Sequence, residues 1–136
     1  MEFTISTAAK CEIFSGIFQN LRTFVDNVNI QFSEKGVHLQ TMDNAHVSVF
    51  ELNIPKEWFD EFNCELKDGF VLGISCNIIS KILNARDKEQ HVKFIYDNSN
   101  TDHLFVEFST TNTTKTIFDK KFELPLVDMD EEALQI

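Results

Sequence analysis

The sequence predicts an α+β fold of two similar halves, each made of a strand, a helix and three more strands, with both helices on one face of antiparallel sheets. Three observations lead to this prediction. Apolar residues recur at helical spacing in two segments, apolar and polar residues alternate in the segments around them, and the resulting order of elements occurs twice. Two halves that share one core would explain the repeat, and an ordinary α+β domain with an accidental repeat would show the same pattern.

The first half opens with a short strand-like segment, residues 1–7. From Ala8 to Val25 the apolar residues follow the helical period, which predicts an amphipathic helix. Gly16 lies inside this helix, where glycine costs about 1 kcal/mol relative to alanine, and we interpret it as an imperfection rather than a site of close contact. A proline opens the segment 55–62, which we expect to form a helical turn. Between the two helical segments we expect three strands, at 28–33, 36–42 and 46–54.

The second half repeats this order. We expect a strand at 69–75, a helix from Cys76 to Ala85, and then strands at 91–97, 103–110 and 115–124. The apolar residues that share one face of the second helix are Ile78, Ile79, Ile82 and Leu83. This face should pack on the sheets.

The segment 36–52 reads as a hairpin with an unusual turn. Apolar residues alternate with polar ones on both sides of it: Val37, Leu39 and Thr41 before the turn, and Val47, Val49 and Phe50 after it. Met42 and His46 bracket a turn that is too long for the two-residue type, and Met42 places an apolar side chain where water is expected. We expect Val49 to lie in the core and Met42 to lie outside it.

The chain has 22 acidic and 12 basic residues, and its formal net charge of −10 by itself argues against nucleic-acid binding. The positions of the charged residues matter more than the net charge, because the polar faces of the two predicted helices hold cations and few acids. Those polar residues are Lys10, Ser15, Gln19 and Arg22 on the first helix, and Asn77, Lys81, Asn84 and Arg86 on or beside the second. A mildly basic helix side suits weak contact with a polyanion, although ordinary solvated helix faces have the same composition.

The 136 residues are enough for one domain, and they contain no motif for catalysis, nucleotide binding or metal binding. The histidines lack metal-ligand spacing, and the acidic run 128–132 lacks the glycine and final glutamate of a calcium loop. The three cysteines lie far apart, which indicates reduced core thiols. We therefore predict no catalytic residue, no metal and no cofactor. Because neither a signal peptide nor a membrane span is found, we expect a protein that is neither secreted nor in a membrane.

The hairpin sequence GVHLQTMDNAHVSVFEL, residues 36–52, closely resembles the signature hairpin of the eukaryotic sliding clamp family, proliferating cell nuclear antigen. The segments ISKILNA and PLVDMDEEALQI, residues 79–85 and 125–136, resemble its second helix and its interdomain linker, and the likeness extends over the whole chain. The family's DNA-clamp fold contains two similar halves in each domain and two domains in each subunit. The resemblance implies that residues 1–127 are an N-terminal clamp domain and that 128–136 begin the linker to a second domain, which is absent here.

In this family, three subunits close a ring around duplex DNA, and a hydrophobic pocket receives a short peptide motif from DNA polymerases, ligases and nucleases. The resemblance implies weak, sequence-independent DNA contact, a clamp loader as a further partner, and a place in the nucleus or at the replication site of a DNA virus. Met42 adapts well to such a pocket because its thioether is flexible. The matching pocket positions are Met42, His46, Val47 and Val49 in the loop, and Leu134 and Ile136 in the linker.

The resemblance also assigns a DNA-facing side and a subunit edge. Serine and glycine stand at positions 15 and 16, where the family usually carries a lysine pair, so the expected DNA affinity is reduced. The expected DNA contacts are Lys10, Arg22, Lys81 and Arg86. The strand around 115–123 matches the edge that joins a neighbouring subunit in a homo-trimer once the second domain is present, with Phe122 as its aromatic contact beside Lys121 and Glu123.

Three alternatives stay open at this point. A checkpoint-type clamp subunit would form a hetero-trimer, and a clamp-derived scaffold would bind proteins without encircling DNA. An enzyme that uses aspartate and glutamate comes third, because no residue pairing supports it.

Overall fold

The structure is a computed structural model that describes residues 1–43, 45–64, 69–97, 99–110 and 118–127. Within these residues the chain forms two α-helices, α1 (Ala8–Leu21) and α2 (Cys76–Asn84), and one 3-10 helix, η1 (Lys56–Trp58). The strands are β1 (Glu2–Ile5), β2 (Asn27–Ser33), β3 (Gly36–Met42), β4 (Val49–Pro55), β5 (Glu61–Asn63), β6 (Phe70–Ser75), β7 (His91–Asp97), β8 (Asn100–Ser109) and β9 (Lys120–Pro125). The predicted order of strand, helix and three strands occurs in both halves.

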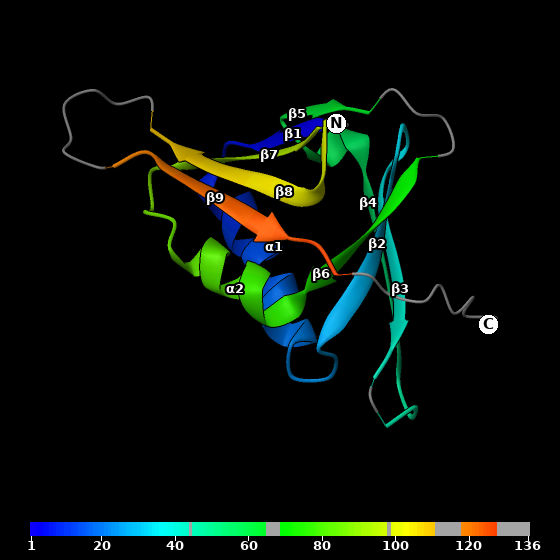
Figure 1. Cartoon of the computed structure of the whole chain (residues 1–136). Helices are drawn as coiled ribbons and strands as arrows, with labels where there is room; N and C mark the ends of the chain where they lie inside the picture. Colours follow the sequence, from blue (N-terminus) through cyan, green and yellow to red (C-terminus); the bar gives the residue numbers. More distant parts are fainter. Residues whose placement is uncertain (44, 65–68, 98, 111–117, 128–136) are drawn as a thin grey trace.

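The strands form two antiparallel sheets, and each sheet takes strands from both halves (Figure 1). Sheet A has the order β5-β1-β7-β8-β9, and sheet B has the order β4-β3-β2-β6. The first strand of each half therefore pairs with the second strand of the other half, β1 with β7 and β6 with β2. The two helices lie side by side on the inner side of the sheets, which confirms the predicted α+β class.

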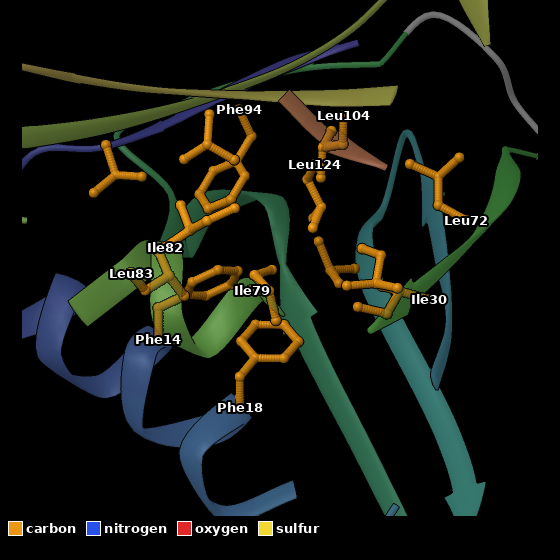
Figure 2. Close-up of a cluster of buried hydrophobic side chains, with 14 of the residues drawn as sticks. Phe14, Phe18, Ile30, Leu72, Ile79, Ile82, Leu83, Phe94, Leu104 and Leu124 are labelled. Carbon is orange, nitrogen blue, oxygen red and sulfur yellow. The ribbon is translucent and has the colours of Figure 1, made fainter. Parts of the chain in front are cut away.

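One apolar core joins the two halves. Figure 2 shows Phe14 and Phe18 of α1 beside Ile79 of α2, and all three point toward side chains of both sheets. The rings of Phe14 and Phe94 lie 5.4 Å apart, and Phe94 stacks on Phe3 at 4.6 Å. Because the halves exchange strands and share these side chains, neither half has a core of its own.

Both helices begin at side-chain caps. The Thr7 Oγ1 accepts a hydrogen bond from the backbone N–H of Lys10, and the Ser75 Oγ accepts one from Ile78, each at 3.4 Å. The first helix ends at Leu21 rather than at the predicted Val25, because the chain turns there and the Phe24 N–H bonds back to Leu21. Apolar periodicity continues through this turn, and it is therefore a poor guide to the helix end.

Several boundaries differ from the prediction. The strand β5 was not expected, and β4 begins only at Val49 and includes Pro55, which is tolerated because β4 is an edge strand of sheet B. The second-half strand β8 begins at Asn100, before the predicted start, and β9 begins at Lys120; residues 115–117 of the predicted segment 115–124 lie outside the described residues. Ile78 is 39% exposed and so does not share the buried face of α2.

The interpretation of Gly16 is confirmed. A Cβ atom added at this position would meet nothing within 4 Å, so no neighbouring group requires a glycine there. The helix therefore carries a residue of low helix propensity in open space.

Candidate functional site

The hairpin formed by β3 and β4 carries the predicted pocket residues at its tip. Met42 pairs with Val49 across the two strands, so their side chains share one face, whereas Phe50 faces the core from the opposite side. Val49 is 50% exposed, and its predicted place in the core is wrong. The reason is that Phe50, Leu52 and Ile54 of β4 face the core, so Val49, which alternates with them, lies on the opposite side of the strand.

Asp43 holds the turn that follows Met42, and sequence reasoning missed it. Its carboxylate Oδ1 accepts hydrogen bonds from the backbone N–H groups of Val47 and Ser48, at 2.8 Å and 3.1 Å. The backbone of Asp43 also donates to the Ser48 carbonyl and accepts from the N–H of His46, both at 3.0 Å. Aspartate commonly binds turn backbone in this way, so its position directly after a strand was an available signal.

This turn leaves apolar side chains exposed at a fixed place. His46 has a left-handed backbone with φ of 60°, and Val47, which follows it, is 81% exposed. Three residues, here called the tip residues, therefore offer apolar surface at a turn in which the N–H groups of Val47 and Ser48 bind Asp43: Met42, Val47 and Val49. Such a surface can receive an apolar segment of another protein. The other predicted pocket residues, Leu134 and Ile136, lie outside the described residues.

Two of the four predicted DNA contacts bind the protein's own backbone. The Lys10 Nζ donates to the Trp58 carbonyl at 2.6 Å and lies 5.3 Å from the centre of the indole ring, which ties η1 to α1. The Arg86 Nη1 donates to the carbonyls of the connection after α2, at 3.0 to 3.1 Å. Both cations are therefore partly committed to structure.

Arg22 and Lys81, the other two predicted contacts, are exposed. The side chain of Gln19 on α1 donates a hydrogen bond to the Asn84 side chain on α2, so the polar faces of the helices meet. The charge that this helix side presents is therefore concentrated on fewer cations than the sequence suggests. Its role toward DNA stays a prediction.

The predicted subunit edge, β9, lies at the border of sheet A, and among the described residues only β8 pairs with it. The Phe122 ring lies 5.5 Å from that of Phe108 and is half-buried. The outward-facing Lys121 forms an ion pair with Glu107 at 3.4 Å, and Glu123 is exposed. The edge thus combines a partly buried aromatic ring with charged side chains.

The start of β9 is fastened to the end of α2 by side chains that were not predicted. The Lys120 Nζ donates to the Ala85 carbonyl at 2.6 Å and lies 2.9 Å from the Asp87 carboxylate. Gln90, which is only 1% exposed, donates to the Phe118 carbonyl at 2.6 Å and accepts from the Asp87 N–H at 3.0 Å. A buried glutamine has to find such partners, but the sequence does not say which.

The cysteines are free thiols. Cys11 and Cys76 are buried as predicted, whereas Cys64 is partly exposed. Burial raises the pKa of the Cys76 thiol to about 11, with a further contribution from the Asp26 carboxylate, and burial also raises the pKa of Cys11. The described residues contain no cluster of side chains that could hold a metal ion, and no helix among them is long and apolar enough to span a membrane.

Comparisons with known proteins agree with this architecture. The family model for the N-terminal domain of proliferating cell nuclear antigen matches residues 2–133. Proliferating cell nuclear antigen 2 from Plasmodium falciparum (isolate 3D7) is 30% identical over 128 residues, which cover 92% of this chain and 47% of that protein. The chain thus spans about half the length of this curated relative. It belongs to the proliferating cell nuclear antigen family, and it matches the N-terminal domain of that family.

Proposed function

We propose that this chain is the N-terminal part of a DNA sliding-clamp subunit, a processivity factor for DNA replication and repair. Residues 1–127 would form the clamp domain, and 128–136 would begin the linker to a second domain. The match to the family's N-terminal domain and the relative of about twice the length support an N-terminal part of a longer subunit, and the boundary at 127 is part of the proposal. The protein would act without enzymatic chemistry, in the nucleus or at the replication site of a DNA virus.

In this proposal the ring holds duplex DNA by encirclement more than by contact. Arg22 and Lys81 supply exposed positive charge on the helix side, and Lys10 and Arg86 can add only what their backbone contacts leave free. The net charge of −10 disfavours close binding elsewhere on the chain. DNA contact is therefore expected to be weak, independent of sequence and sensitive to salt.

The single observation that carries the docking role is the group of apolar tip residues, with Val47 and Val49 exposed and Met42 half-buried, at a turn held by Asp43. Peptides of DNA polymerases, ligases and nucleases, and of the clamp loader, would place an aliphatic and an aromatic side chain against this surface. Met42, His46 and Val47 would form one wall, and Leu134 and Ile136 the other. A flexible methionine suits partners of different shape.

Ring closure would use the free edge of β9. Phe122 would contact the second domain of a neighbouring subunit, with Lys121 and Glu123 beside it, while backbone groups extend sheet A. Three copies of the two-domain chain would then make a homo-trimer.

The decisive experiment is loading of the two-domain chain onto nicked circular DNA by a clamp loader, followed by cutting of the circle. A ring should stay bound in moderate salt on the circle and leave through the ends once the DNA is linear. Release that does not depend on DNA topology would favour a scaffold that never encircles DNA. A chain that closes a ring only when other clamp subunits are added would favour the checkpoint type.

A further inference from the structure

The chain leaves sheet A by crossing the edge of sheet B at a glycine. After β9, the N–H of Leu126 donates to the Asp102 carbonyl, and the N–H of Val127 donates to the Gly73 carbonyl, each at 2.9 Å. Gly73 is a buried residue of β6, an edge strand of sheet B, and Figure 1 shows the segment that follows β9 reaching this strand. These two bonds join the exit of the chain to both sheets.

The crossing leaves no room for a side chain on β6. A Cβ atom added at Gly73 would lie 2.2 Å from the carbonyl oxygen of Val127 and 3.2 Å from its carbonyl carbon. Both atoms belong to the backbone, so no rotamer change can relieve the overlap. Any other residue at position 73 would displace the backbone at Val127 by about 1 Å, because non-bonded heavy atoms approach no closer than roughly 3 Å.

Close approach, and not backbone conformation, explains this glycine. Positive φ occurs at Gly36 and Gly69 but not at Gly73, so an L-residue could adopt its backbone angles. Gly16 provides the opposite case, because its surroundings are empty. The two glycines therefore predict opposite responses to the same substitution.

We infer that Gly73 is a positioning residue for partner binding, which fixes where the chain starts its path toward the docking surface. This inference rests on the proposed function, because it requires Leu134 and Ile136, which follow Val127 in the sequence, to form a wall of the peptide pocket. The tip residue Met42 belongs to β3 of the same sheet as Gly73, so sheet B serves as the common frame. Fixing the chain at Val127 would restrict the positions open to a wall built from the residues that follow, which would lower the entropic cost of binding.

The test uses the full two-domain chain with three variants. Gly73→Ala adds the obstructing methyl group, Val127→Pro removes the N–H that binds Gly73 from the other side of the contact, and Gly16→Ala adds the same methyl group in open space. Hydrogen exchange would report on the amides of Leu126 and Val127, and calorimetry would report the affinity for a polymerase-type peptide with one aliphatic and two aromatic residues. Light scattering and thermal melting would follow assembly and folding.

We expect Gly73→Ala and Val127→Pro to expose the Leu126 amide to exchange and to weaken peptide binding about tenfold, while the trimer mass is kept. The Gly16→Ala variant should match the parent in both respects. A merely structural role would lower the melting temperature and leave the affinity of the folded protein unchanged, which would overturn the inference.

Two further outcomes are informative. If Gly73→Ala does not fold, Val127→Pro still breaks the contact and decides the question. If the parent chain binds no peptide, the proposed pocket and the role of Gly73 in partner binding both fail, and exchange then tests only whether Gly73 fixes the chain at Val127. Loss of Val127 amide protection in Gly73→Ala would support that role, and retained protection would refute it.

Discussion

The two halves close with equivalent hairpins, β3–β4 in the first half and β8–β9 in the second, but the two hairpins present different chemistry. In the first, the distinctive feature is the turn, where Asp43 bonds the backbone and leaves Val47 exposed. In the second, it is the last strand, where Lys120 fastens the start of the edge and Phe122 packs on Phe108. In the proposed function, the same topology would serve docking in one half and assembly in the other, because topology places the strand edges while side chains decide their use.

The largest expected effect is a loss of trimer assembly that leaves peptide binding unchanged. Replacing Phe122 by alanine in the two-domain chain should remove an aromatic contact at the edge and destabilise the trimer by about 2 to 4 kcal/mol of interface energy. Light scattering should then show smaller species at concentrations where the parent is trimeric, while peptide affinity per chain stays the same. A trimer that is indifferent to Phe122→Ala would remove β9 as the ring interface.

The second prediction concerns the tip of the first hairpin. Met42→Ala should weaken binding of the partner peptide by about 1 to 3 kcal/mol, because it removes an apolar contact from the docking surface. Calorimetry would measure this loss, with the trimer mass as a check that assembly is intact. Gln40→Ala is the matched control, since Gln40 lies two residues earlier on the same face of β3 and should have little effect. Equal losses for both variants would argue against the assignment of the tip residues.

A smaller effect is expected for the residue that holds the turn. Asp43→Ala removes the acceptor for two backbone N–H groups and should weaken peptide binding by about 1 to 2 kcal/mol through a less ordered turn. Asp97 is the control in the second half: its Oδ1 accepts the Ser99 N–H at 2.9 Å, and this bond lowers the pKa of its carboxyl group. If Asp97→Ala weakened peptide binding as much as Asp43→Ala does, the effect would reflect a general loss of folding and not a property of the hairpin tip.

The smallest effect concerns the buried thiols, Cys11 in the first half and Cys76 in the second, which should react alike. At pH 8 a thiol reagent should label Cys64 quickly, whereas Cys11 and Cys76 should react only on unfolding, because burial keeps both as neutral thiols. The Cys76 pKa is raised from 9.0 to about 11, so its contribution to stability is complete below pH 9 and is lost as the pH rises toward 11. Urea denaturation at pH 8 and pH 10 should show this decrease, and the decrease should be smaller in Cys76→Ala. Rapid native labelling of Cys76 would contradict its burial.

Much of the fold follows from local pattern. The segment 91–97 was predicted with the bounds that the structure has, because a run with strand periodicity and turns on both sides leaves little choice. The predicted helix starts, Ala8 and Cys76, are also the observed ones, and the side chains of Thr7 and Ser75 cap them. The short strand β5 was missed because its three residues show no period, and it forms only by pairing with β1.

The tip residues show which features could not be predicted from the sequence. Met42 was expected outside the core and is half-buried at the tip, as the hairpin pattern indicates. Val49 was expected inside the core because alternation cannot distinguish a covered face from an open one at a sheet edge. Its exposure depends on which face of β4 packs on the core, and the pairing and packing of the whole sheet decide this.

By itself, the sequence determined the class of fold, the order of its elements, the hairpin and the membership of a family, because these depend on periodicity and on residue identity along the chain. Only the tertiary structure decided which of the predicted DNA-contacting cations bind the protein itself. Lys10 donates to the Trp58 carbonyl, and Arg86 donates to the Gln90 carbonyl in the connection after α2. The tertiary structure also decided that Gly73 has to be a glycine, because the chain returns to that point only at Val127. Contacts between residues so far apart in sequence have no local signature; they exist because two sheets share one core and the chain leaves one sheet across the edge of the other.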